Sequence, residues 1–265
     1  MTPLFFGLGN RRLFGLYTPA RPAANGAARA ALLCAPLGQE YLCAHRSMRQ
    51  LGLQLSSCGY DVLRFDYFGT GDSSGDFLQA DLRGWEEDIA TAIDELKDTS
   101  GARRVVLVGM RLGAALAARV AVKRPRDLQA LVLWDPVVAG TEYLHELLSF
   151  GSGETPSAAP TRQRATGIGG GHEVLGFPLN ARMEDSLAEL DLVALVPSLP
   201  ERSLIAVTQP TPSYPAVVEA VAKRPESAIV CERLEGLPAW LNDEDTGAGA
   251  VPINVLQRIT QWLTP

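Results

Sequence analysis

Residues 105–115 read Val105-Val106-Leu107-Val108-Gly109-Met110-Arg111-Leu112-Gly113-Ala114-Ala115. The four aliphatic residues at its start predict a buried strand, and the Ala-rich run that begins at Leu112 predicts a helix. Gly109 and Gly113 bracket the turn between the two elements, where only glycine lets the backbones come close together. This arrangement places Arg111 at the carboxyl end of a strand, which is where open α/β sheets bind their ligands.

The turn has the pattern of a nucleophile elbow, Gly-x-Ser-x-Gly, with Arg111 in the position of the serine. A guanidinium stays protonated and has no usable lone pair, so it cannot attack a carbonyl carbon. The sequence therefore predicts the framework of a nucleophile site without the nucleophile.

Composition limits the classes of partner and cofactor. The 265 residues fit one α/β domain with an insertion, and the formal net charge of −6 argues against a nucleic acid partner. The cysteines Cys34, Cys43, Cys58 and Cys231 are scattered and form no C-x-x-C pair, so reduced thiols are expected. No cofactor or metal motif is present, and we expect neither group.

The sequence also bears on location. The N-terminal residues lack a basic segment followed by an apolar run, so no signal peptide is predicted. No apolar run approaches the length of a membrane span, which is about 18 residues. We therefore expect a cytoplasmic protein without a membrane partner.

Strands and helices alternate along most of the chain. An N-terminal hairpin is expected from residues 5–7 and 12–17, with its turn at Gly9-Asn10. Further strands are predicted at 30–34, 61–66, 104–108, 128–134, 203–207 and 227–233. Helices are predicted at 47–57, 82–97, 112–123, 214–222 and 252–263. This rhythm predicts an α/β fold with a mostly parallel sheet flanked by helices.

The regular pattern is interrupted between residues 140 and 200. A short helix is predicted at 142–148 and a longer one at 183–195, while the Gly/Ser/Thr/Pro-rich segment 151–171 is expected to be mobile. We therefore divide the chain into a core (1–140 and 201–265) and a lid or cap insertion, 141–200, between the sixth and seventh strands.

Four segments carry a family resemblance: residues 34–40 (Cys-Ala-Pro-Leu-Gly-Gln-Glu), 64–75 (Arg-Phe-Asp-Tyr-Phe-Gly-Thr-Gly-Asp-Ser-Ser-Gly), the elbow, and 132–137 (Val-Leu-Trp-Asp-Pro-Val). With them the chain resembles the α/β-hydrolase superfamily, in particular serine-aminopeptidase-like and dienelactone-hydrolase-like members. It is also similar to a bacterial branch, the "hydrolase 2" proteins associated with exosortase systems, in which arginine in the elbow is usual. The resemblance implies an α/β-hydrolase fold with a short lid and an oxyanion loop at residues 34–40.

The catalytic residues that the resemblance implies are missing. Arg111 replaces the serine, residues 207–213 (Val-Thr-Gln-Pro-Thr-Pro-Ser) supply no carboxylate after the seventh strand, and no histidine follows Glu235. Residues 237–242 (Leu-Pro-Ala-Trp-Leu-Asn) occupy the loop of the histidine. A Ser-His-Asp mechanism needs a base beside the hydroxyl and an acid behind that base. Hydrolysis by a serine triad is therefore not expected, although other enzyme mechanisms stay open.

The candidate pocket is built around Arg111. At a helix N-terminus, its guanidinium either binds a carboxylate, phosphate or acyl carbonyl or forms an internal salt bridge with Glu40 or Asp135. Asp135 is also a candidate general base. The candidate pocket residues are Arg111, Met110, Leu112, Leu37, Gly38, Glu40, Asp135 and Tyr67.

Other polar and aromatic residues are assigned less specific roles. Phe68, Tyr41, Trp134, Tyr143 and Leu144 are expected with Tyr67 around the pocket mouth, as lid packing or an acyl-binding surface. A Cys43–His45 nucleophile pair is disfavoured, since residues two apart near a helix start do not face each other. His172 is interpreted as a solvated lid residue.

Three functions remain open. The first is a catalytically degenerate protein that binds an acyl or anionic small molecule, or a protein partner, through the former pocket and lid. The second is an enzyme of a different mechanism, such as an acyltransferase, thioesterase-like or cyclising enzyme, in which Arg111 and backbone donors near Leu37 and Leu112 stabilise negative charge. The third is a structural subunit that docks through its lid, and a homodimer is also open. Fold alone does not choose between them.

Overall fold

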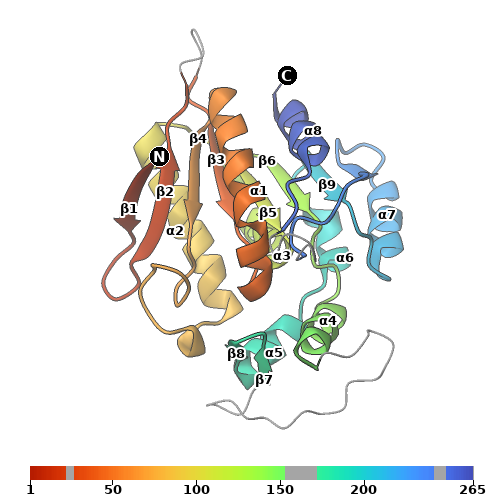
Figure 1. The fold of residues 1–265 in the computed structure, drawn as a ribbon. Coiled ribbons are helices and arrows are strands. Elements are labelled where there is room, and N and C mark those ends of the chain that lie inside the picture. The colour runs from red at the N-terminus through yellow and green to blue at the C-terminus, as the bar shows by residue number, and fades with distance from the viewer. Residues whose placement is uncertain (22–26, 153–171, 242–248, 265) are drawn as a thin grey trace.

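A computed structural model describes residues 1–21, 27–152, 172–241 and 249–264. Its centre is an eight-stranded sheet in the order β1-β2-β4-β3-β5-β6-β9-β10 (Figure 1). The strands are β1 (Thr2–Phe6), β2 (Leu13–Thr18), β3 (Ala30–Cys34), β4 (Asp61–Phe65), β5 (Val105–Met110), β6 (Leu128–Trp134), β9 (Ser203–Val207) and β10 (Val230–Arg233). The hairpin β1–β2 is antiparallel and β2 pairs antiparallel with β4, whereas the pairs from β4 to β10 are parallel. This confirms the predicted mostly parallel sheet.

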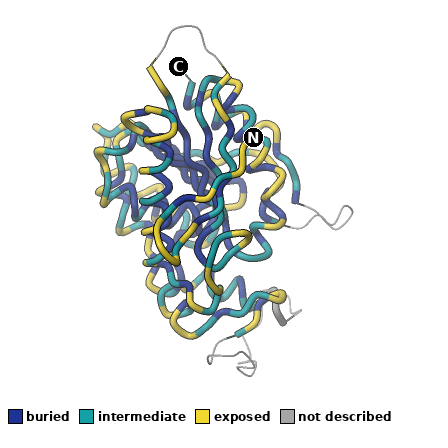
Figure 2. The backbone as a smooth tube through the Cα atoms, turned by 90° about the vertical axis from the view of Figure 1, so that its left-hand side faces the viewer, coloured by how far each residue is buried: buried dark blue, intermediate teal, exposed yellow. Residues whose placement is uncertain are grey.

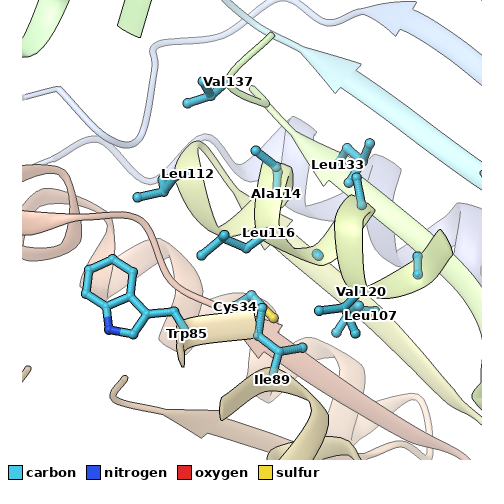
Figure 3. Packing of buried hydrophobic residues seen from close by; sticks show 14 of the residues in the cluster. Cys34, Trp85, Ile89, Leu107, Leu112, Ala114, Leu116, Val120, Leu133 and Val137 are labelled. Atoms are coloured by element: carbon cyan, nitrogen blue, oxygen red, sulfur yellow. The ribbon is translucent and has the colours of Figure 1, made fainter. Parts of the chain in front are cut away.

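Successive side chains of the central strands point to opposite faces of the sheet, so the core has two layers. Leu32, Leu107 and Leu133 point to the face covered by α2 (Leu82–Ser100) and α3 (Leu112–Lys123), as the packing in Figure 3 shows for Leu107 and Leu133. Their neighbours, such as Leu33 and Val108, face α1 (Gly38–Ser57) and α8 (Ile253–Leu263). The central strands β3, β5, β6 and β9 are buried in the middle of the molecule because helices cover both faces of the sheet (Figure 2).

The insertion at residues 141–200, named the lid segment below for its place in the chain, lies beyond the carboxyl ends of the strands, at the lower end of the sheet in Figure 1. It contains α4 (Gly140–Ser152), the hairpin β7 (His172–Val174) and β8 (Phe177–Leu179), α5 (Ala181–Ala188) and α6 (Leu192–Leu195). After β9 the chain forms α7 (Tyr214–Ala222), and short 3₁₀ helices occupy Phe77–Gln79, Pro125–Asp127 and Val196–Ser198. Of the segment expected to be mobile, 151 and 152 end α4, and 153–171 lie outside the described residues.

The start of the first helix was predicted nine residues too late. Helix α1 begins at Gly38 rather than at residue 47, so Gly38 and Glu40 are helical rather than part of a loop. The buried face continues backwards from Met48 through Ala44 to Glu40 at a spacing of four residues. Glu40 is a carboxylate at a buried helical position, so it interrupts the apolar pattern on this face. The apolar pattern therefore did not show that the helix begins as early as Gly38.

The lid segment also differs from its prediction. The single helix expected at 183–195 is two helices, because Asp191 interrupts it and caps α6 by accepting a hydrogen bond from Ala194 N at 3.0 Å. The hairpin β7–β8 was missed, since each of its strands has only three residues. His172 is not simply solvated: its Nδ1 lies 2.7 Å from Glu184 Oε1. No helix in the described part of the chain is long and apolar enough to cross a membrane, while the cytoplasmic location stays a prediction.

Candidate functional site

The turn from β5 to α3 has the strained backbone of an elbow. Arg111 adopts φ 52° and ψ −121°, a conformation that L residues rarely occupy. Both flanking glycines are required by close contacts: a Cβ on Gly109 would lie 2.4 Å from the Gly113 carbonyl oxygen, and one on Gly113 would lie 2.3 Å from that of Ala35. The sequence thus preserves the elbow although its central residue is arginine.

The guanidinium of Arg111 is held by two carboxylates. Its Nε donates to Glu40 Oε1 at 2.8 Å, and its Nη2 donates to Glu146 Oε2 at 2.6 Å. Glu40 also accepts a hydrogen bond from the Tyr143 hydroxyl at 2.8 Å. Glu146 and Tyr143 belong to α4, so these bonds tie the lid segment to the core. The side chain of Arg111 is only 2% exposed, and a cation buried this deeply needs such partners.

One face of the same guanidinium is covered by Trp240. Arg111 Cζ lies 3.7 Å from the centroid of the Trp240 ring, a cation–π contact. The indole Nε1 points to Asp135 Oδ2 at 3.4 Å. Trp240 belongs to the loop after β10. Its two contacts place the indole ring between Arg111 at the elbow and Asp135, the acid that follows β6.

Asp135 is held by the chain that follows β9. Its Oδ1 accepts hydrogen bonds from the backbone N–H groups of Thr208 (2.6 Å) and Gln209 (3.3 Å), and its Oδ2 accepts one from the Thr208 hydroxyl (2.6 Å). Within the described residues Asp135 forms no ion pair, so of the two acids named from the sequence Glu40 pairs with Arg111 and Asp135 does not. The saturated, buried Asp135 carboxylate lacks the open position that a general base needs.

Burial shifts the ionisation of these groups. It raises the pKa of Glu40, against the attraction of Arg111, and raises the pKa of Asp135, against its hydrogen bonds from Thr208 and Gln209. Burial lowers the pKa of Arg111, but Glu40 and Glu146 raise it further, and the net shift is upward. Arg111 therefore remains a cation at every physiological pH.

Two cavities adjoin this network. The smaller has a volume of about 100 Å³ and is mainly apolar. It is lined by Leu37, Gly38, Gln39, Glu40, Cys43, Leu147, Val174, Leu175, Phe177, Leu179, Trp240 and Leu241. The larger, of about 700 Å³, is lined by Arg111, Tyr143, Glu146 and other residues of the lid and the loop after β9. Trp240 and Leu241 contribute to both walls, so the cavities are neighbours.

The eight candidate pocket residues fall into two groups. Leu37, Gly38 and Glu40 line the smaller cavity and Arg111 the larger one, whereas Met110, Leu112, Asp135 and Tyr67 line neither. Tyr67 instead stacks on Trp85 with a centroid separation of 4.9 Å, inside the layer of Figure 3 that contains Trp85 and Leu112. An aromatic residue after a strand was expected at the pocket mouth, but apolar packing between β4 and α2 holds it in the core.

Two functional contacts were missed by sequence reasoning. Glu146 lies one turn after Glu142 on α4, which the sequence predicted only as a short helix at 142–148, and Trp240 lies in an irregular loop. An arginine that must be buried signals a need for carboxylates, but the sequence does not show which ones fold against it. Cys43 and His45 both lie in α1, with Cys43 in the cavity wall, and no metal-binding group of His, Cys, Asp and Glu occurs in the part of the chain described.

Comparisons with known proteins agree with this fold. Residues 43–171 match the family model of the serine aminopeptidases. The structure superimposes on Est1E from Butyrivibrio proteoclasticus with bound ferulic acid. The TM-score is 0.71 at 15% identity, and the match covers 98% of this chain and 97% of that chain. The chain has the fold of the α/β-hydrolases.

Two relatives match a shorter stretch of sequence. The human mitochondrial palmitoyl-protein thioesterase ABHD10 is 38% identical over 76 residues, which is 29% of this chain and 24% of the relative. A human (lyso)-N-acylphosphatidylethanolamine lipase is 35% identical over 72 residues, which is 27% of this chain and 21% of the relative. The chain thus spans about a quarter of the length of these relatives or less.

Proposed function

We propose that this protein binds an acyl-bearing small molecule in the pocket beside the elbow and does not hydrolyse it by a serine triad. The observation that carries the proposal is the Arg111 network: the elbow residue has no nucleophilic atom, and its charge is already met by Glu40 and Glu146. The network closes the site to nucleophilic chemistry at the elbow, while the apolar cavity beside it remains.

The apolar cavity supports an acyl ligand. Leu147, Val174 and Leu179 of the lid segment face Leu37 and Cys43 of the core across it. Burial of a hydrocarbon chain between such walls is favourable by about 0.8 kcal/mol per methylene. The names of two relatives, a palmitoyl-protein thioesterase and a (lyso)-N-acylphosphatidylethanolamine lipase, refer to acyl compounds as well.

The ion pairs favour binding over an alternative enzyme. An oxyanion stabiliser must direct its donors to the position where negative charge develops. Arg111 directs Nε and Nη2 to carboxylates, so a developing oxyanion would have to displace one of them. For the same reason, a neutral acyl group suits the site better than an anionic one.

Turnover and binding measurements test the proposal together. We expect 4-nitrophenyl octanoate and octanoyl thioesters to hydrolyse at the buffer rate in the presence of the wild type and of Arg111→Ala. We expect octanamide, a neutral acyl compound, to bind the wild type by calorimetry. Turnover that depends on Arg111 would instead establish an enzyme.

A pair of surface variants locates the binding. Leu175 is exposed at the rim of the apolar cavity, and Leu8 is exposed on the N-terminal hairpin. Leu175→Lys places a charge at the cavity mouth and should weaken octanamide binding, whereas Leu8→Lys adds the same charge far from it. Equal binding by both variants would place the acyl site elsewhere.

A further inference from the structure

The smaller cavity is open at one end and closed at the other. Leu147 of α4, Val174 of β7, Leu179 of β8 and Cys43 of α1 line it, and each of them is 6% exposed or less. Leu175 lines the same cavity and is 48% exposed. Leu175 therefore marks the mouth of the cavity, and the four buried side chains mark its inner end.

Among the described residues, the inner end offers a ligand no strong hydrogen-bond donor that is unused. Glu40 lines the cavity, and its oxygens accept hydrogen bonds from Arg111 Nε and from the Tyr143 hydroxyl, both at 2.8 Å. Trp240 directs its indole Nε1 to Asp135 Oδ2, at 3.4 Å. A buried carbonyl oxygen without a donor is costly, so the cavity favours an acyl group with its methyl end inside and its carbonyl at the mouth.

The volume of the cavity limits how much of a chain fits. A cavity of about 150 Å³ lined by Leu, Ile and Phe side chains holds one benzene molecule, with its six carbon atoms. In proportion, the volume of about 100 Å³ found here has room for about four carbon atoms. Side chains in a packed interior yield little, so the wall does not adapt to a longer chain by a small shift.

We infer that this pocket selects short acyl groups, holding about four chain carbons beyond the carbonyl, an inference that rests on the proposed acyl-binding function. The buried side chains of the lid segment, Leu147, Val174 and Leu179, set this limit. A longer chain keeps its further methylenes at the mouth beside Leu175, where water still reaches them. The gain in affinity from chain length therefore ends when the cavity is full.

Three straight-chain amides test the limit, because acetamide, pentanamide and octanamide differ in steps of three methylenes. Each methylene that enters the cavity should raise the affinity about fourfold. By calorimetry, with acetamide measured in competition with pentanamide, we expect pentanamide to bind about 60-fold more tightly than acetamide. Octanamide should bind no more than about fourfold more tightly than pentanamide, because its three further methylenes lie outside the cavity.

The same titrations distinguish two kinds of failure. A second gain of about 60-fold, from pentanamide to octanamide, would overturn the length limit while leaving acyl binding intact. Absence of binding by both pentanamide and octanamide would overturn the proposed function itself.

Matched variants test whether the lid side chains set the limit. Leu147→Ala removes three carbon atoms from the wall, so octanamide should now bind about 60-fold more tightly than pentanamide. Leu187→Ala is the control, since Leu187 is a fully buried residue of the lid segment outside the cavity wall, and it should keep the wild-type limit. An equal gain for octanamide in both variants would show that a loosened lid segment, not the cavity wall, governs chain length.

A conservative variant gives the opposite change and does not depend on a cavity that stays open. Val174→Ile adds one carbon atom to the buried wall, so the cavity should be full one methylene earlier. Butanamide and pentanamide should then bind with nearly equal affinity, whereas in the wild type pentanamide should bind about fourfold more tightly. An undiminished preference for pentanamide in Val174→Ile would contradict the assigned wall.

Discussion

The guanidinium of Arg111 lies 3.7 Å from the ring centroid of Trp240, and the indole of Trp240 in turn reaches Asp135. The three residues come from the elbow, the loop after β10 and the end of β6. Their order in space, elbow residue, ring and carboxylate, is the order of Ser, His and Asp in a catalytic triad. Arg111, Trp240 and Asp135 therefore form a three-residue chain of contacts from the elbow to the end of β6.

Removal of the central cation should strongly destabilise the protein. Arg111→Met leaves Glu40 buried and unpaired, which costs about 3–5 kcal/mol of unfolding free energy. In a Glu40→Gln background the same substitution should cost clearly less, because a neutral amide needs no cation. Urea denaturation of the four proteins of this double-mutant cycle measures the coupling, and strictly additive effects would contradict a buried pair.

The raised pKa of Glu40 makes a prediction about pH. Above its ordinary value of 4.5, and below its raised value in the native state, Glu40 holds its proton more tightly when folded than when unfolded. The native state then binds more protons, so this residue's contribution to stability is present at low pH and is lost as pH rises through that window. Glu40→Gln cannot titrate. Its stability relative to the wild type should therefore improve as pH rises from 4.5.

Chemical unfolding of the wild type and of Glu40→Gln at a series of pH values from 4.5 upward measures the difference between their unfolding free energies. Groups that titrate in the same way in both proteins cancel in that difference. If the wild type instead gained stability relative to Glu40→Gln as pH rises, the native state would lower the pKa of Glu40. The ion pair with Arg111 would then outweigh burial.

The glycines of the elbow give a steric prediction. A Cβ on Gly113 would lie 2.3 Å from the Ala35 carbonyl oxygen and 2.4 Å from that of Cys34, and neither backbone group can move freely. Gly113→Ala should cost about 2–3 kcal/mol or more. Gly52→Ala is the matched control in another helix, because its nearest contact is a side-chain carbon at 3.5 Å. There alanine should stabilise the protein by up to about 1 kcal/mol. Thermal unfolding of both variants decides the comparison.

These glycines also show why the fold was predictable. Gly109, Gly113 and the aliphatic run before them are local signals, and the strands 30–34, 128–134 and 203–207 were located to the residue because each is a short apolar run between turns. Glu40 and Asp135 were both named as alternative salt-bridge partners of Arg111 because each follows a neighbouring strand, and Glu40 is the one that forms the ion pair. Glu146 and Trp240 were not, since their approach depends on how the lid segment and the loop after β10 fold against the core. Tyr67 was misplaced because an aromatic residue packs equally well in a core and at a pocket.

The ion pair between the lid segment and the core should control the local stability of α4. Glu146→Gln removes the charge that meets Arg111 Nη2, so the amide hydrogens of α4 should exchange faster while those of α3 keep their rate. Glu189→Gln alters an exposed carboxylate in the same segment and should change neither helix. Native-state hydrogen exchange followed by mass spectrometry measures both. Unchanged exchange in α4 of Glu146→Gln would show that other contacts hold the helix.

The contact chain through Trp240 predicts which substitutions could create a hydrolase. Arg111→Ser alone supplies a hydroxyl but leaves Trp240, which cannot accept a proton, in the place of the base. Ester hydrolysis by this variant should stay at the buffer rate.

Arg111→Ser combined with Trp240→His puts an imidazole between the new hydroxyl and Asp135, which already receives the N–H of residue 240. We expect this double variant to hydrolyse 4-nitrophenyl acetate faster than either single variant, with a pH profile that reports a histidine. Loss of that activity on a further Asp135→Asn change would identify Asp135 as the residue that orients the base, whereas activity in Arg111→Ser alone would show that the base lies elsewhere.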